Sequence, residues 1–359
     1  MLDIVRNYVA FIVFTLILTS IPAQAEPLLV GTTFSPRQNE YLGQDWKKAY
    51  ISILEMGFDV IRLAAYWNVI EKEKDVYNFK ALDWQIKEAK KRKIPVVLVV
   101  GMKAPRWPEY HIPEWLLAEV DLKPGQEIGK NPTLGERTLK FIKKTVNRYK
   151  NKPAVGYWQV ENEPLGRFGP HFWWIGEEFL AQEVSLVRKL DPGGRPIVIT
   201  AETYPNNFIR FIMGLIPPRT PIRDAMQLCD ILGINIYPAV GKKFWRFNYY
   251  IRTRQLERLR YFSKLIKQAK RCGKKVWITE LQAEPWEAGK LVHKSPERPV
   301  SIWPDMIQTT FTEMKTLGID AVFLWGAEYW YFRKTRYGDV AWWQQAADIL
   351  NKKVSGTSF

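Results

Sequence analysis

The segment Pro95-Val-Val-Leu-Val-Val100 is a short, unbroken run of apolar residues that ends at a glycine. Seven further runs of this kind lie along the chain, at Leu28–Thr33, Asp59–Ala64, Val155–Val160, Pro196–Ala201, Ile231–Ile236, Lys275–Thr279 and Ala321–Trp325. Runs that are apolar almost throughout are typical of parallel strands that are covered on both faces. We therefore interpret all eight runs as buried parallel strands.

Longer amphipathic segments separate these runs. Apolar residues recur there at spacings of three and four, as in Trp46–Leu54 and Leu82–Ala89, which is the pattern of a helix with one buried face. A strand followed by a helix, eight times over, predicts a single (β/α)8 TIM barrel, an α/β fold, spanning about residues 26–355. An open doubly wound sheet is the alternative, but no Gly-x-Gly-x-x-Gly turn follows the first run. The last expected helix runs from about Val340 to Asn351.

Residues 1–25 differ from the rest of the chain. Arg6 precedes the apolar run Tyr8–Leu18, and the small-residue sequence Ala23-Gln-Ala25 follows it. This arrangement predicts a secretory signal peptide, with an uncleaved N-terminal anchor as the alternative. We expect an exported protein, secreted, periplasmic or on the cell surface, which contacts a membrane only if the segment is retained.

Composition limits the possible partners. The net charge is +16, and basic residues are dense between Lys242 and Lys275. Such a field can attract nucleic acid or another acidic polymer, but the charges lie along several expected helices, so we favour a solvated surface and expect no nucleic-acid partner. The two cysteines, Cys229 and Cys272, each precede a predicted strand and either pair or remain free thiols. The three histidines lack metal-ligand spacing, so we expect no metal or other cofactor, and we expect a monomer.

Two glutamates stand where predicted strands end. The fourth strand ends in Gly156-Tyr-Trp-Gln-Val-Glu-Asn-Glu-Pro164, and the seventh ends in Val276-Trp-Ile-Thr-Glu-Leu281. Barrel enzymes build their sites at the carboxyl ends of the strands, so Glu163 and Glu280 are expected at the same end. Glycosidic cleavage requires a protonated carboxyl and an ionised carboxylate on opposite sides of the bond, and this pair supplies both.

Each assignment has a structural alternative. Glu163 could be an ordinary carboxylate at a helix start, and Glu161, at the same strand parity, could be a buried structural group. Glu284 and Glu287 compete with Glu280, but they lie beyond the apolar run and are expected on a mobile loop.

The two strand ends resemble those of the glycoside hydrolases of clan A, which include cellulase-like, mannanase-like and β-galactosidase-like members. The resemblance covers about residues 28–350, and its strongest elements are Trp158-Gln-Val-Glu-Asn-Glu-Pro164 and Trp277-Ile-Thr-Glu280. It implies that Glu163 is the acid/base, that Glu280 is the nucleophile, and that the configuration at the sugar carbon is retained.

Weaker matches agree with this resemblance. They imply that Arg62 lies beside the nucleophile, that Tyr237 donates a hydrogen bond to it, that Asn162 contacts the sugar 2-hydroxyl, and that Trp325 forms a platform under the sugar. The chain departs from the cellulase-like family 5 pattern, which places histidines near the third and sixth strand ends. Here Met102 and Lys103 follow the third strand, and Asn235 lies on the sixth.

Several tryptophans follow predicted strand ends, where flat indole faces could stack on pyranose rings. They are Trp67, Trp107, Trp115, Trp173, Trp286 and Trp330, of which we select Trp67, Trp107 and Trp286 as substrate-binding residues.

The expected activity is hydrolysis of a β-linked oligo- or polysaccharide by double displacement. Transglycosylation by the same carboxylate pair is one alternative, and a glycan-binding barrel without turnover is another. Long segments at Gly101–Asn131 and Ala239–Tyr249 follow strand ends and point weakly to an extended cleft for a polymer.

Overall fold

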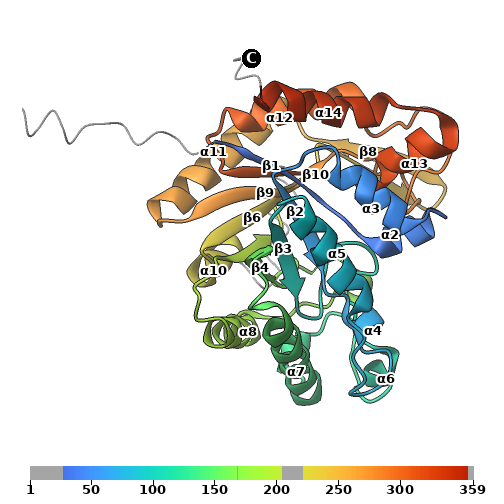
Figure 1. Cartoon of the computed structure of the whole chain (residues 1–359). Helices are drawn as coiled ribbons and strands as arrows, with labels where there is room; N and C mark the ends of the chain where they lie inside the picture. The colour runs from blue at the N-terminus through green and yellow to red at the C-terminus, as the bar shows by residue number, and fades with distance from the viewer. Residues whose placement is uncertain (1–26, 168, 204–220, 355–359) are drawn as a thin grey trace, which may run out of the picture.

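The computed structural model describes residues 27–167, 169–203 and 221–354. Eight parallel strands close into a barrel (Figure 1), which confirms the predicted (β/α)8 architecture. Around the barrel they are β1 (Leu29–Thr33), β2 (Val60–Ala64), β3 (Val96–Val100), β4 (Val155–Val160), β5 (Ile197–Ala201), β6 (Ile231–Ile236), β9 (Lys275–Gln282) and β10 (Ala321–Trp325). Each strand begins within one residue of its predicted run, and β9 continues beyond the predicted end at Thr279.

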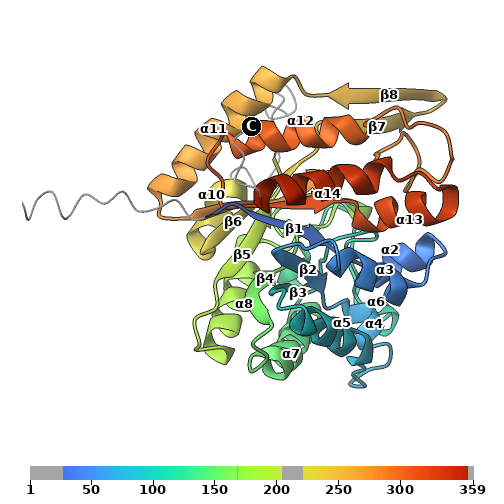
Figure 2. The ribbon, with the colours of Figure 1, turned by 45° about the horizontal axis from the view of Figure 1, so that its top comes forward.

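Helices surround the barrel (Figures 1 and 2). The longer ones are α3 (Trp46–Leu54), α5 (Lys80–Lys91), α7 (Pro132–Tyr149), α8 (Glu177–Leu190), α10 (Pro221–Leu228), α11 (Gln255–Arg271), α12 (Pro304–Lys315), α13 (Ala327–Tyr337) and α14 (Ala341–Val354). Short helices α2 (Pro36–Tyr41), α4 (Trp67–Ile70) and α6 (Glu114–Leu117) lie in the connections, with 3-10 turns at Ile128–Lys130 and Pro170–Phe172. Helix α7 begins where Asn131 accepts the N–H of Leu134 at 3.0 Å and Pro132 occupies the first turn.

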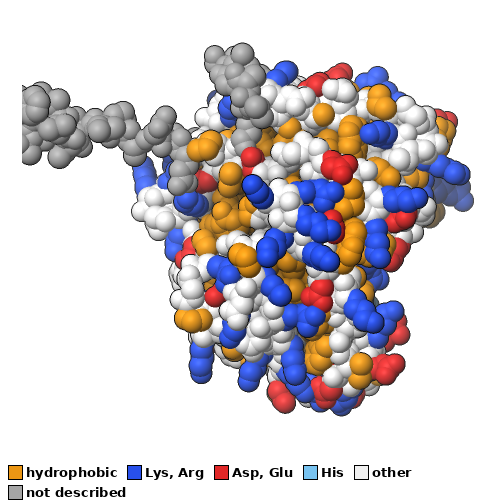
Figure 3. Space-filling view, viewed as in Figure 1, with side chains coloured by type: hydrophobic (Ala, Val, Ile, Leu, Met, Phe, Trp, Pro, Cys, Tyr) orange, Lys and Arg blue, Asp and Glu red, His pale blue; other side chains and the backbone are white. Residues whose placement is uncertain are grey.

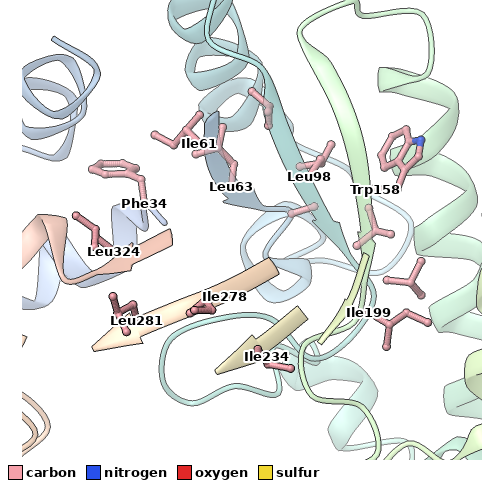
Figure 4. Close-up of a cluster of buried hydrophobic side chains, with 14 of the residues drawn as sticks. Phe34, Ile61, Leu63, Leu98, Trp158, Ile199, Ile234, Ile278, Leu281 and Leu324 are labelled. Atoms are coloured by element: carbon pink, nitrogen blue, oxygen red, sulfur yellow. The ribbon is translucent and has the colours of Figure 1, made fainter. Parts of the chain in front are cut away.

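Alternate strand residues fill two separate layers of core. Outward-facing side chains from successive strands, among them Ile61, Leu98 and Ile199, pack against the helices (Figure 4). Inward-facing residues form a second cluster inside the barrel, which contains Val60, Val97, Val198, Ile231, Trp277, Ala321 and Phe323. These inward residues lie in the first half or the middle of their strands, so the barrel is filled with apolar groups at its amino end. Toward the carboxyl end the inward positions include polar side chains such as Arg62, Thr200 and Glu280, which build the site.

The segment Ala239–Tyr249, expected as a long insertion, folds as an antiparallel hairpin of β7 (Ala239–Phe244) and β8 (Phe247–Arg252). Both cysteines are free; Cys229 is buried and Cys272 is exposed, so the alternative of a disulfide is not realised. Among the described residues, no helix is both long enough and apolar enough to cross a bilayer. Lys and Arg side chains are scattered over the face seen in Figure 3 rather than gathered in one area.

Candidate active site

A cavity of about 510 Å³ contains most of the predicted site residues, and the segments that line it follow the carboxyl ends of β3, β4, β6, β9 and β10. The predicted residues in its wall are Trp107, Asn162, Glu163, Tyr237, Glu280, Trp286 and Trp325. The structure therefore brings together seven residues that come from widely separated parts of the sequence. Arg62 is fully buried beside this wall, on β2.

A β-bulge positions Glu280. Strand β9 pairs with β6 so that Ile278 lies opposite Ile234, but Glu280 lies opposite the next residue, Asn235. Thr279 is therefore the extra residue, and a bulge of this kind re-aims the side chains around it. As a result, Thr279 and Glu280 both contact polar groups in the site although they are adjacent in the chain.

Two donors hold the Glu280 carboxylate. Arg62 donates from Nη2 to Oε1 at 2.6 Å, and the Tyr237 hydroxyl donates to Oε2. Arg62 is itself fixed, since Nε donates to Thr33 Oγ1 at 2.8 Å. Burial and the negative charge of Glu280 raise the pKa of Tyr237 well above its usual range, so the hydroxyl remains protonated and able to donate. Both contacts implied by the family resemblance are present.

The chain bends sharply at Glu163. Glu161 and Glu163 have φ values of 60° and 47°, a left-handed conformation that is uncommon for residues with a side chain and often occurs at functional sites. The Glu163 N–H donates to Thr200 Oγ1 at 2.7 Å, which ties the bend to β5. Asn235 Nδ2 donates to the Glu163 carboxyl at 2.7 Å, and Asn235 Oδ1 accepts from Thr279 Oγ1 at 2.8 Å. Asn235 therefore connects Glu163 to the bulge that carries Glu280.

The surroundings of Glu163 favour its protonated form. Burial raises its pKa well above the usual range, and the negative charges of Glu202 and Glu280 raise it further, against the opposing charge of Lys103. Glu280, in contrast, is paired with the guanidinium of Arg62. The two carboxyl groups therefore share one cavity but have contrasting surroundings, which is the arrangement that acid and nucleophile roles need.

Glu161 has a structural position. Its carboxylate is fully buried and accepts the N–H groups of Met102 at 2.7 Å and Lys103 at 2.6 Å. Gly101 makes this approach possible, because a Cβ there would lie 2.0 Å from a Glu161 oxygen. Glu161 thus fixes the segment that follows β3 instead of facing the cavity.

That segment contributes site residues that the sequence analysis missed. The Arg106 guanidinium lies 3.9 Å from the centroid of the Trp325 ring, pairs with Glu284, and contacts Glu328 at 2.5 Å. Lys103 is fully buried and donates from Nζ to the Glu163 carbonyl oxygen at 3.0 Å. None of these residues belongs to a motif, and only their place in the long segments after strand ends could have indicated them.

Glu109, Lys242 and Lys290 also line the cavity and were missed. The two rivals of Glu280 have other contacts. Glu284 pairs with Arg106, and Glu287 accepts the N–H groups of Val300 at 3.1 Å and Ser301 at 2.8 Å.

The structure contradicts the prediction for Trp67. Its ring is fully buried and stacks on Phe141 at 5.2 Å, and its Nε1 donates to Glu71, because Trp67 opens helix α4 and turns toward the core. Trp173 and Trp330 are also buried, and Trp115 is not part of the cavity wall. Trp107 and Trp286, in contrast, are 55% and 41% exposed and line the cavity.

Within residues 27–167, 169–203 and 221–354, no group of three or more His, Cys, Asp or Glu side chains is arranged to hold a metal ion.

A family model described as beta-galactosidase (glycoside hydrolase family 42) matches residues 33–173. Beta-galactosidase Bga of Halorubrum lacusprofundi is 25% identical over 160 residues, which are 40% of this chain and 21% of that protein. Beta-galactosidase BgaH of Haloferax lucentense is 24% identical over 159 residues, with corresponding shares of 40% and 22%. The chain thus covers only about a fifth of the length of these curated relatives.

Solved structures share the fold. The beta-galactosidase from Bacillus circulans sp. alkalophilus superposes with a TM-score of 0.65 at 12% identity, covering 91% of this chain and 56% of that one. GH5_18 from Streptomyces cattleya, in complex with GlcNAc, gives a TM-score of 0.60 at 13% identity and covers 93% of this chain and 82% of that one.

The comparisons confirm the resemblance to the clan A barrel glycosidases. The particular family that matches is family 42, over a segment that contains Asn162 and Glu163 and ends before Glu280.

Proposed function

We propose that this protein is a retaining β-glycosidase in which Glu163 is the acid/base and Glu280 is the nucleophile. One observation carries the proposal: the two glutamates share one cavity in contrasting environments. Burial and neighbouring carboxylates raise the pKa of Glu163, and Arg62 and Tyr237 hold Glu280. The family model matched over residues 33–173 makes a β-galactoside the first substrate to test.

The reaction has two steps. A Glu280 oxygen attacks the anomeric carbon and forms a glycosyl ester, while Glu163 gives its proton to the departing oxygen. In the second step Glu163, now ionised, takes a proton from water, and that water displaces Glu280 and releases the sugar with its original configuration. Transfer to a second sugar instead of water uses the same groups, so transglycosylation remains the alternative outcome of the second step.

Neighbouring residues support these steps. Asn162 lines the cavity, and its Oδ1 accepts from Gln159 Nε2 and Thr200 Oγ1, each at 3.3 Å. Its Nδ2 has no hydrogen-bond partner among the described residues and is available to a sugar hydroxyl. Trp107 and Trp286 offer partly exposed rings at the cavity wall for stacking.

Hydrolysis of a panel of β-linked galacto-, gluco-, manno- and xylo-configured substrates tests the proposal. Glu163→Gln and Glu280→Gln should each lower kcat/KM for the substrate that is turned over by about three orders of magnitude or more. Glu257→Gln, which changes an exposed carboxylate on α11, should leave it unchanged. If no panel member is hydrolysed, and one binds equally well to all three variants, the glycan-binding alternative is supported instead.

We also propose that residues 1–25 direct export, because of their charged start, apolar run and Ala23-Gln-Ala25 end. The N-terminal sequence of the protein recovered from the cell envelope or the medium tests this. A mature chain beginning near residue 26 supports cleavage, whereas an intact segment on a membrane-associated chain supports the anchor.

A further inference from the structure

The turn of the β7–β8 hairpin exposes large aromatic side chains. Phe244 is 72% exposed, Trp245 is 80% exposed, Phe247 is 70% exposed, and Tyr249 is 46% exposed. Single exposed apolar residues are common on soluble proteins, but a contiguous group marks a surface that binds something. We refer to residues 244–249 as the aromatic tip.

The residues at the tip are not those usually found in a tight hairpin turn. Phe244 pairs with Phe247, so Trp245 and Arg246 form a two-residue turn. Turns of this length favour Gly, Asn or Asp because they need positive φ values, yet Trp245 has a φ of 52°. A bulky aromatic residue in a strained, solvent-exposed conformation contributes nothing to folding that a glycine would not. Its presence points to a role outside the fold.

The base of the hairpin is held firmly, so the tip is presented by a fixed arm. Ala239 exchanges hydrogen bonds with the Gln282 side chain, at 3.1 and 2.7 Å. The Gly241 N–H donates to the Trp286 carbonyl at 2.7 Å, and Tyr250 donates to Glu287 at 2.8 Å. A Cβ on Gly241 would lie 2.4 Å from the backbone nitrogen of Ala288, so this close contact requires glycine.

The charged residues of the hairpin and its flanks are all basic. Between Ile231 and Leu256 the sequence contains no Asp or Glu, and its cations are Lys242, Lys243, Arg246, Arg252 and Arg254. Across the part of the chain that the structure describes, no carboxylate forms an ion pair with the first three. A neutral glycan gives such cations no counter-charge, whereas an anionic lipid headgroup does.

We propose that the aromatic tip docks on an anionic lipid bilayer, with its rings in the headgroup region and the cations Lys243 and Arg246 against the phosphates. Aromatic residues prefer this interface, and basic residues add attraction to anionic lipids. The tip places exposed Phe and Trp side chains at and beside a two-residue turn. This contact is separate from the N-terminal segment.

The aromatic tip lies at the same end of the barrel as the cavity. Lys242, on the same face of β7 as Phe244, lines the cavity, and its Nζ lies 5.8 Å from the Trp286 ring centroid. In Figure 2 the hairpin runs along the top, with its turn on the side toward which the arrow of β1 points. That is the end of the barrel where the cavity lies, so docking would hold the candidate site at the membrane surface.

Vesicle partitioning of the full chain tests the proposal, with vesicles of phosphatidylcholine alone or mixed with phosphatidylglycerol. The protein should partition to the anionic vesicles, less so at high salt, and their presence should slow hydrogen exchange of the amides of residues 244–249. Phe244→Ser/Trp245→Ser/Phe247→Ser should weaken partitioning by about tenfold or more, and Lys243→Glu/Arg246→Glu should weaken it too. Val76→Ser, another exposed apolar position, should not change it.

Three results would overturn the proposal: no partitioning, partitioning that the triple variant retains, or bound protein whose residues 244–249 exchange as in solution. Protection of the tip by a soluble β-glucan or β-galactan, but not by vesicles, would replace the lipid with a glycan. Thermal unfolding checks that the variants fold. If the triple variant does not fold, the single variant Trp245→Ser takes its place in the vesicle experiment.

Discussion

Asn235 is the residue that joins the two candidate catalytic groups. It accepts from Thr279, which adjoins Glu280, and donates to the Glu163 carboxyl. In the sequence, Asn235 stood out only because the cellulase-like pattern places a histidine near the end of the sixth strand. An amide can hold a carboxyl group without adding a charge that titrates near neutral pH, so it orients Glu163 over a wide pH range.

We therefore predict a shifted pH profile for Asn235→Ala. A donor to a carboxyl group stabilises the ionised form, so its loss should raise the pKa of Glu163 further. The alkaline limb of kcat/KM, which reports loss of the proton from the acid, should move to higher pH by about half a unit or more, and kcat should fall about tenfold. The measurement is kcat/KM against pH, with the surface variant Asn151→Ala as control. An alkaline limb that stays in place or moves to lower pH would contradict this role.

The sequence was enough to predict some of the site residues but not others. Arg62 and Glu280 lie on strands and Tyr237 directly follows one, all in recognisable patterns, and their predicted contacts are present. Arg106 and Glu284 come from separate connections and have no pattern that relates them. Trp67 follows a strand as the other loop tryptophans do, but the direction of its ring depends on helix packing, which spacing alone does not specify.

At the scale of elements, the barrel strands were predictable and their irregularities were not. Apolar runs bounded by glycine, proline and polar residues mark buried strands, and all eight were found within one residue at their starts. The bulge in β9 and the hairpin of β7 and β8 depend on pairing with neighbouring segments. Such pairing is a non-local property, so a single run of sequence does not disclose it.

The bulge depends on a glycine in the next strand. A Cβ at Gly233 would lie 2.8 Å from both Thr200 and Thr279, which contact Glu163 and Asn235. Gly233→Ala should lower the free energy of unfolding by about 1–3 kcal/mol and also reduce kcat, because it pushes these two residues apart. Gly156→Ala in β4 is the matched control, since its Cβ would meet no atom closer than 3.5 Å. Denaturant unfolding of both variants tests this, and equal losses of stability would contradict it.

At the scale of the whole molecule, folding buries a pair of carboxyl groups behind the site. Burial raises the pKa of Glu161 to about 7, and burial and the adjacent Glu161 raise the pKa of Glu183 well above its usual range. The two carboxyl groups are close enough that each influences the pKa of the other. Both groups hold protons in the folded state at a pH where the unfolded chain has released them. The stability that they contribute is complete at low pH and is lost as the pH rises through the folded pKa values.

Glu183→Gln should reduce this pH dependence. The amide carries no titrating proton, so the slope of unfolding free energy against pH should become shallower by up to about 1.4 kcal/mol per pH unit between pH 5 and 7. Other acids with raised pKa values, such as Glu109 and Glu328, contribute equally in both proteins and cancel in the comparison. Urea unfolding across this range, with Glu257→Gln as control, measures the slopes. Identical slopes for Glu183→Gln and the parent would contradict the claim that Glu183 holds a proton in the folded state.

The central claim is that Glu280 attacks the sugar, and covalent trapping tests it most directly. A 2-deoxy-2-fluoro β-glycoside with a dinitrophenolate leaving group should form the glycosyl ester quickly and release it slowly, because fluorine destabilises the positive charge that develops at the sugar carbon. Peptide mass spectrometry should then find one sugar per chain, on Glu280, and no label in Glu280→Gln. A label on Glu284, Glu109 or Glu163, or rapid turnover with inversion of configuration, would contradict the proposed mechanism.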